Sequence, residues 1–236
     1  MEQIRITFCS EIKHSAEDLM KCAALLLCVV LSLDSASSVS YYSYVKHVPL
    51  KPLSLSAFTL CMRISVDPRV VDAEGRETIL FAYRTKDFDE LTVWQEKGQL
   101  SFYMSSGTGA FFPLKPLFTF RTNLCLTWES SSGLATFWVD GRRSMLQEYR
   151  KKHRVQPGGV VILGQDPDTF YGDFDAKQSF VGEISDVNMW DFVLTERQIR
   201  AFNEKGWSEP IPNVLRWSEM EGEVNGEVLV VPESNL

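Results

Sequence analysis

Short segments rich in β-branched and aromatic residues, several with alternating apolar and polar positions, recur along the chain from Ala57 onward. Gly, Pro, Asp and Ser residues separate them, which is typical of strands and turns in an antiparallel β protein. Asp140-Gly141 tolerates the positive φ of a tight turn and predicts a hairpin. Ten segments are predicted as strands: Phe58–Ser65, Thr78–Tyr83, Glu90–Gln95, Leu100–Met104, Leu124–Glu129, Ala135–Val139, Val160–Leu163, Phe180–Trp190, Val214–Trp217 and Val228–Val231.

Only one stretch has the pattern of a helix. Thr195 can act as the N-cap, and Gln198 follows three residues later to complete a capping box. Ile199 and Phe202 share one face of this helix, and Gly206 ends it. Many strands and one short helix predict an all-β fold, a two-sheet antiparallel sandwich.

The longest apolar stretch is Cys22–Leu33, which has twelve residues. A bilayer-spanning helix needs about 20, so this stretch is too short to cross a membrane. A preceding lysine and the small residues that follow are typical of a signal peptide, with a buried core helix as the alternative. We therefore expect an upstream extension over 1–19, a signal peptide over 20–37 and one secreted, extracellular domain over 38–236.

Secretion changes how the cysteines are interpreted. Cys61 and Cys125 are the only cysteines downstream of the predicted signal peptide. In an oxidising compartment two cysteines form one disulfide, and a pair of buried free thiols is the alternative. Neither cysteine has a CxxC partner, so a zinc site has no ligand set.

Composition and charge narrow the function. The chain has 236 residues, of which 44% are hydrophobic and 23% charged, as in an ordered globular protein. With 24 basic and 31 acidic side chains, the formal net charge is -7. Such a chain lacks the basic surface that binds a phosphate backbone, so nucleic acid is not an expected partner.

Candidate catalytic residues are few. His47 and His153 are not near a Ser or Cys in a recognisable nucleophile motif, so a catalytic triad is not predicted. A sandwich can also host glycosidases with paired carboxylates, for which Glu183 and Asp186 are the nearest candidates. A second acidic group is predicted to be a solvated edge: Glu219, Glu221, Glu223 and Glu227. We expect no enzyme, and a glycosidase is the alternative.

The best candidate for a binding site is the segment Asp166–Gln178. It contains four aspartates and ends on an amide. Carboxylates this concentrated repel one another unless water or a cation compensates, and their hard oxygen atoms suit Ca²⁺. The spacing differs from that of an EF-hand. The alternative is a well-solvated acidic loop.

Five segments form an ordered series of motifs: Asn123–Ser130, Phe137–Gly141, Ile162–Gln165, Gln178–Ile184 and Asn188–Asp191. In this series the chain resembles the pentraxin family. The similarity runs from about Ser43 to the C-terminus, and Asn123 stands where the family signature usually begins with His. The resemblance implies a secreted, disulfide-bonded, lectin-like jelly-roll sandwich that assembles as a homopentamer.

The resemblance also implies two calcium ions per subunit, on one face of the domain. Asp166 and Asp175 stand where the family often has glutamate. Phe88 stands where the family has an aspartate, which puts the first calcium ion in question. Matched by position, the calcium ligands are Asp89, Asp166, the main-chain oxygen of Pro167, Asp168, Asp175 and Gln178.

By the same resemblance, Trp94 and Tyr103 lie at the positions of an aromatic ligand pocket. Aromatic faces attract choline or ethanolamine cations by about 0.5–2 kcal/mol, and ordinary core aromatics are the alternative. The implied function is calcium-dependent pattern recognition in innate immunity and the acute phase. The implied partners are phosphocholine, phosphoethanolamine or acidic glycans on microbes and damaged cells, together with complement or receptors. The alternative is a calcium-impaired pentraxin that acts as a structural or protein-binding module.

One departure from the family concerns its N-terminal strand. The family normally has a Phe-Val-Phe-Pro-like strand before the position of Ser43, where this chain has only Ser38–Tyr42. A missing strand predicts an exposed sheet edge with unpaired backbone groups.

Overall fold

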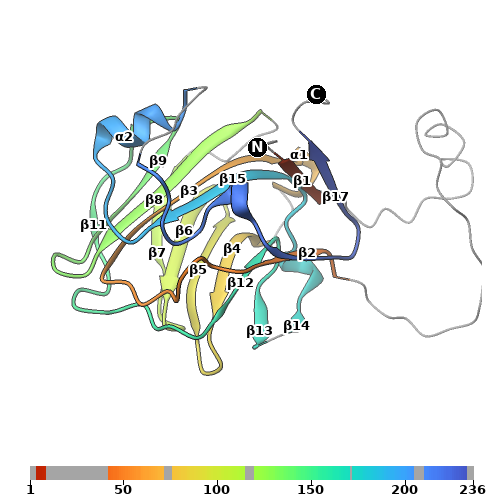
Figure 1. The fold of residues 1–236 in the computed structure, drawn as a ribbon, viewed down its shortest axis with the longest axis horizontal. Helices are drawn as coiled ribbons and strands as arrows, with labels where there is room; N and C mark the ends of the chain where they lie inside the picture. The colour runs from red at the N-terminus through yellow and green to blue at the C-terminus, as the bar shows by residue number, and fades with distance from the viewer. Residues whose placement is uncertain are drawn as a thin grey trace, which may run out of the picture.

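The computed structural model describes residues 4–8, 42–71, 76–114, 120–170, 172–204 and 210–232. Within them, two antiparallel sheets pack face to face as a sandwich (Figure 1). The predicted sandwich is therefore confirmed. No helix among these residues is long and apolar enough to cross a membrane.

The first sheet, here called sheet A, has eight strands. Its strands are β1 (Ile4–Phe8), β3 (Ala57–Val66), β8 (Thr122–Glu129), β9 (Leu134–Val139), β10 (Arg142–Arg143), β11 (Gln147–Glu148), β15 (Gly182–Trp190) and β17 (Val228–Pro232). They follow the order β10-β9-β8-β3-β15-β1-β17, and β11 also pairs with β9.

The second sheet, sheet B, has seven strands. They are β2 (Tyr44–His47), β4 (Thr78–Arg84), β5 (Asp89–Glu96), β6 (Gln99–Met104), β7 (Ala110–Pro113), β12 (Val160–Leu163) and β16 (Gly222–Asn225). Their order is β16-β2-β12-β4-β5-β6-β7. The acidic edge predicted near the C-terminus is confirmed, because β16 lies at the end of this sheet and its residues are largely exposed.

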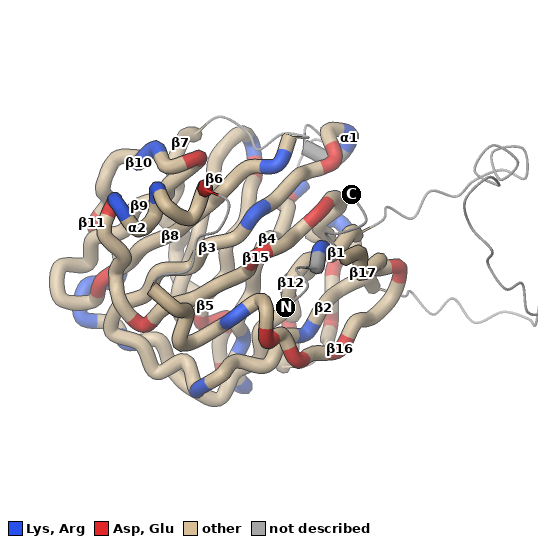
Figure 2. The backbone as a smooth tube through the Cα atoms, turned by 45° about the horizontal axis from the view of Figure 1, so that its top comes forward, with Lys and Arg blue, Asp and Glu red and all other residues tan. Residues whose placement is uncertain are grey.

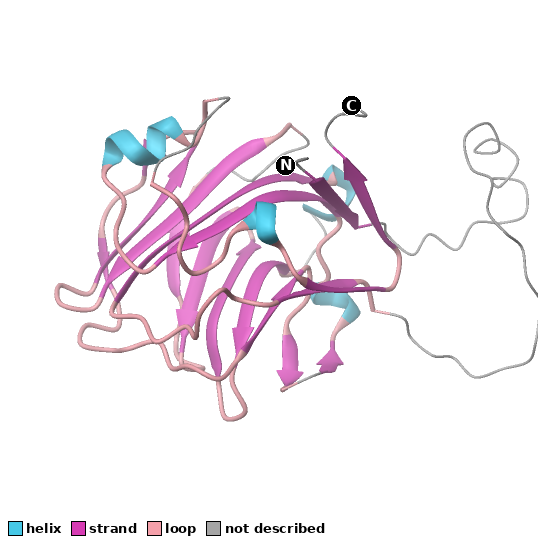
Figure 3. Ribbon diagram, in the orientation of Figure 1, coloured by secondary structure: helices cyan, strands magenta, loops and turns pink. Residues whose placement is uncertain are grey.

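A separate two-stranded hairpin and four short helical turns complete the described structure (Figure 3). The hairpin consists of β13 (Pro167–Thr169) and β14 (Gly172–Phe174). The helical turns are α1 (Pro68–Val71), η1 (Ala176–Gln178), α2 (Glu196–Ala201) and η2 (Trp217–Glu219).

Alternation along β3 shows how the sequence builds the core. Every second side chain is buried between the sheets: Phe58, Leu60, Met62, Ile64 and Val66. The intervening residues belong to the other face, as expected from the two-residue period of a strand. There, Cys61 is buried with Ile199 of α2 and Phe202 in a smaller cluster. Helix α2 therefore covers the outer face of sheet A.

Several local predictions are confirmed. Asp140 and Gly141 have φ angles of 49° and 71° at the turn between β9 and β10. Thr195 and Gln198 form the predicted capping box. The strand predicted over Val214–Trp217 is wrong: Leu215 forms an isolated bridge with Met189, and a 3₁₀ turn follows.

Strand β1 corrects the expectation of an exposed edge. It lies between β15 and β17 and pairs with both. Ile6 and Phe8 are buried in the core, and the Phe8 ring lies 5.5 Å from that of Phe180. Residues 4–8 thus cover the edge, although they precede the apolar stretch. The predicted signal peptide, 20–37, lies outside the described residues.

Candidate functional site

The acidic segment projects from the end of β12. Gly164, with φ of 85°, turns the chain out of sheet B, and the segment then forms the β13–β14 hairpin. Figure 1 shows this hairpin and α2 on opposite sides of the sandwich. The candidate site therefore lies on the sheet B side, away from α2.

Asp166 is the buried centre of the site, with 7% of its surface exposed. The Tyr103 hydroxyl donates to Oδ2 at 3.3 Å, and the Thr92 hydroxyl donates to Oδ1 at 3.4 Å. Burial, followed by the charges of Asp89 and Asp168, raises the pKa of Asp166 to about 7. In the described part of the chain, no basic side chain forms an ion pair with this carboxylate.

Asp168 and Asp89 approach the same region from different elements. Asp168 lies on β13 and is exposed, whereas Asp89 begins β5. The pKa of Asp168 is raised by burial first, and then by Asp89 and Asp173. Asp89, Asp166 and Asp168 therefore repel one another, which is the condition that a bound cation relieves.

Gln178 offers an oxygen to the site. Its Nε2 donates to Oε2 of Glu77 at 3.0 Å, so the amide orientation is fixed. Its Oε1 is buried and has no hydrogen-bond partner among the residues that the structure describes. A buried acceptor without a partner is costly unless a ligand satisfies it.

Asp175 is oriented by the backbone that follows it. It caps η1, and its Oδ1 accepts a hydrogen bond from the Lys177 amide at 2.8 Å. Pro167 is buried next to Asp166. Of the matched ligands, the structure thus brings Asp166 and Asp168 close enough to Asp89 to interact by charge, and it orients Gln178 and Asp175 at the end of the same segment.

Asp89 differs from the other acids because it has a cationic partner. Arg84 Nη1 forms an ion pair with Asp89 Oδ1 across the β4–β5 turn. Phe88 is 45% exposed and Asp87 is also exposed. Across the described residues, no three His, Cys, Asp or Glu side chains form a preformed metal cage.

The predicted pocket aromatics lie beside Asp166. The Trp94 ring lies 5.3 Å from Tyr103 and 6.0 Å from Phe111, measured between centroids. Trp94 is only 6% exposed, whereas Phe111 is 41% exposed. The Tyr103 hydroxyl links this aromatic group to the acidic segment.

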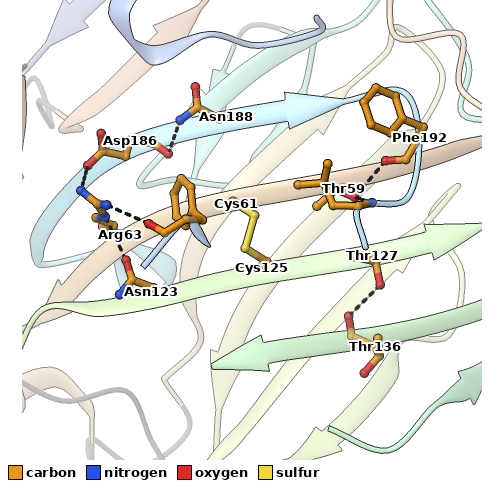
Figure 4. Close-up of a disulfide and its surroundings, with 12 residues drawn as sticks. Thr59, Cys61, Arg63, Asn123, Cys125, Thr127, Thr136, Asp186, Asn188 and Phe192 are labelled. Carbon is orange, nitrogen blue, oxygen red and sulfur yellow. Dashed lines mark hydrogen bonds and ion pairs between the residues drawn. A yellow bond between two sulfur atoms is a disulfide. The ribbon is translucent and has the colours of Figure 1, made fainter. Parts of the chain in front are cut away.

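Cys61 and Cys125 form the predicted disulfide between β3 and β8, beneath α2 (Figure 4). The possible glycosidase acids lie on this sheet and are already paired. Asp186 accepts from Arg63 at 3.1 Å and from Arg121 at 3.0 Å, and Glu183 pairs with Arg5 at 2.8 Å. Asp186 is thus engaged by two guanidinium groups, and Glu183 by one.

Three further residues belong to the site: Glu77, Thr92 and Arg84. Glu77 and Thr92 act by hydrogen bonds across the fold, which sequence patterns do not reveal. The sequence did contain a signal for Arg84. Arg84 is a basic residue five positions before Asp89, and the two residues face each other when the residues between them form a turn. Figure 2 shows basic and acidic positions interspersed along the backbone in its view.

Comparison with known proteins supplies independent findings. The model of the "Pentaxin family" matches residues 31–232. C-reactive protein of Danio rerio is 52% identical over 194 residues, covering 81% of this chain and 84% of that protein. Serum amyloid P-component of Rattus norvegicus is 38% identical over 191 residues, covering 80% of each.

Among solved structures, a heptameric SAP-like pentraxin from Limulus polyphemus superposes with a TM-score of 0.74. It is 19% identical and the match covers 98% of this chain and 95% of that one. At this identity the likeness concerns the fold alone. Strand β1 lies before the region that the family model matches.

Proposed function

The chain belongs to the pentraxin family, and we propose that it is a secreted, calcium-dependent pattern-recognition protein of innate immunity. Its proposed ligands are phosphocholine, phosphoethanolamine or acidic carbohydrates. One observation carries the proposal: the buried Asp166 carboxylate has no basic partner among the described residues and belongs to the segment that ends at the unpartnered oxygen of Gln178.

The donor set fits calcium. Asp166, Asp168 and Asp175 provide carboxylates, and Gln178 and the Pro167 main chain provide neutral oxygens. Ca²⁺ takes 6–8 such oxygens in flexible geometry, so a site completed only when the ion binds is acceptable. When bound, the ion supplies the missing positive charge and an attachment point for a phosphate or carboxylate oxygen.

The aromatic group supports the choice of ligand. Trp94, Tyr103 and Phe111 lie together next to the acidic segment. An anion held by calcium leaves the rest of the head group to contact these rings, where a quaternary or primary amine is attracted by cation–π interaction. We propose Trp94 and Tyr103 as this pocket, with Phe111 at its exposed side.

Retention on immobilised phosphoethanolamine or phosphocholine tests the proposal. The protein should bind in calcium and elute in chelator, and Asp168→Asn should abolish retention. Asp173→Asn is the matched control, because it changes an exposed carboxylate of the same hairpin outside the proposed ligand set. Retention that persists in chelator, or that survives Asp168→Asn, would refute the calcium mechanism.

A second candidate is a calcium-impaired pentraxin that works as a structural or protein-binding module. The ion pair between Arg84 and Asp89 and the exposed Phe88 favour it, because they occupy the Asp89 side of the site. This candidate predicts no calcium-dependent retention and no effect of Asp168→Asn.

Secretion and assembly complete the proposal. We propose that 20–37 acts as a signal peptide, so secreted material should begin between Ser37 and Val39 by N-terminal sequencing. We also propose a cyclic homopentamer, in which multivalency would raise avidity by roughly 10²–10⁴ over a single weak site. Mass measurement in solution tests the assembly, and a stable monomer would contradict it.

A further inference from the structure

Arg84 and Asp89 lie at the base of a tightly closed turn. They are register partners where β4 passes into β5. The Thr85 amide donates to the Phe88 carbonyl at 2.9 Å, and the Phe88 amide donates to Oγ1 of Thr85 at 3.1 Å. The backbone therefore holds the guanidinium against the carboxylate.

The ion pair is shielded from water. The side chains of Arg84 and Asp89 are 14% and 19% exposed. The Asp89 amide also donates to Ser106 Oγ at 3.1 Å, which fixes the start of β5. Exposed pairs contribute little, but removing one partner of a shielded pair leaves an uncompensated charge. Arg84 is therefore costly to displace.

Arg84 is the last residue of β4, the strand of sheet B that contacts β13 of the acidic hairpin. A positive charge paired with Asp89 thus already lies near the hairpin without any metal ion. It is a permanent charge, because a guanidinium does not lose its proton in proteins.

The Asp89 side of the site is also poor in oxygen ligands. Phe88 has no side-chain oxygen and is turned outward. Asp87, the next acid along, is exposed within the closed turn. A calcium ion bound there would have to expel Arg84 from Asp89, and position 88 would still offer it no carboxylate.

We propose that Arg84 is a built-in counter-ion that replaces one of the two calcium ions implied by the family resemblance, so that each chain binds a single ion through Asp166, Asp168 and Gln178. The inference rests on the proposed calcium-dependent function. It makes Arg84 a residue that determines metal stoichiometry.

The test counts calcium ions per chain by equilibrium dialysis of the full chain, over a calcium series that extends to about 10 mM so that weak extracellular sites, with Kd of about 0.1–1 mM, are filled. The wild type should bind one. The double variant Arg84→Met, Phe88→Asp removes the counter-ion and supplies a carboxylate, and it should bind two. The matched control Lys86→Met, Phe88→Asp removes an exposed neighbouring cation instead and should still bind one.

Thermal denaturation gives a second readout. Because calcium binds the folded state, the calcium-induced rise in Tm should be larger for the Arg84 double variant than for the Lys86 control. Phe88→Asp alone, which leaves the Arg84 pair intact, should bind one ion. This variant keeps the test decisive if replacement of Arg84 prevents folding.

Two ions on the wild type would overturn the inference and leave the proposed function standing. One ion on the folded Arg84 double variant would also overturn it. No ion on the wild type would overturn both the inference and the calcium mechanism.

Discussion

Two acidic groups on opposite faces of the sandwich differ in how their charges are compensated. On sheet A, Asp186 receives two arginines within 3.1 Å, and Arg63 also binds the carbonyl of Phe202 (Figure 4). On the sheet B side, Asp166 receives two hydroxyl groups but no basic side chain from the described part of the chain, and neighbouring carboxylates repel it.

The difference separates a structural ion pair from a ligand site. The arginines around Asp186 connect β3, β15 and the segment after α2, so its charge holds elements together. The charge of Asp166 has no cationic partner among the described residues, so it opposes folding unless a cation binds. Asp89 is intermediate between Asp186 and Asp166 in how its charge is compensated, because it is paired with Arg84.

The largest expected effect concerns β1, which is joined to β15 of sheet A by the ion pair between Arg5 and Glu183. Phe8→Ala in the intact chain should lower the free energy of unfolding by about 3–5 kcal/mol, because it leaves a cavity beside Phe180. Urea denaturation measures it, with exposed Val230→Ala on β17 as the control. An unchanged stability would mean that β1 does not contribute to the folded sheet of the intact chain.

The next largest effect is expected when the negative charge of Asp186 is removed. Asp186→Asn should lower the free energy of unfolding by about 3 kcal/mol, since Arg63 and Arg121 lose their common anion in a buried setting. The measurement is urea denaturation in chelator, so that calcium plays no part. Asp173→Asn, which removes an exposed carboxylate, should change little, and an equal effect of both variants would contradict the comparison.

Asp166→Asn should have the opposite sign. In chelator at pH 8 it should raise the free energy of unfolding by roughly 1–3 kcal/mol, because the neutral amide is neither repelled nor strongly desolvated. The folded-state pKa of about 7 lies above the ordinary 3.8, so the folded state binds the proton more tightly. Wild-type stability should therefore fall as pH rises from about 4 to about 7, through the Asp166 contribution.

The Asp166→Asn variant should lack this contribution over the same pH range. It should also lose the calcium-induced rise in Tm. A variant that is less stable than the wild type in chelator would show that Asp166 is compensated in the apo protein by something other than calcium.

Sequence patterns predicted the fold where local and tertiary preferences agree. β3 and β8 alternate regularly because each has one face in the core, and Thr195 to Gln198 forms its cap within four residues. Val214–Trp217 is apolar for another reason: Val214 and Leu215 pack into the core from a loop. From composition alone, a buried loop that lacks regular strand pairing cannot be distinguished from a buried strand.

Sequence patterns could not predict the pairing of strands that are far apart in the chain. β1 is separated from the rest of the domain by the apolar stretch, and nothing in Ile4–Phe8 identifies β15 as its partner. Sequence patterns singled out the acidic segment as one candidate unit, but the contrast between Asp89 and Asp166 depends on which side chains face them. Arg84 and Tyr103 provide that difference across strands.

The smallest expected effect concerns the ion pair between Arg5 of β1 and Glu183 of β15. Glu183→Gln removes the ion pair with Arg5 but keeps the size of the side chain, and Glu183 is 37% exposed. Partly exposed pairs contribute less than about 1 kcal/mol and are screened by salt. Urea denaturation at low and high salt should show a small loss at low salt that disappears at high salt. Because Arg5 belongs to β1, the loss should also vanish in a chain without β1, where the carboxylate has already lost this partner. A salt-independent loss would instead indicate that Glu183 supports β15 through contacts other than its charge.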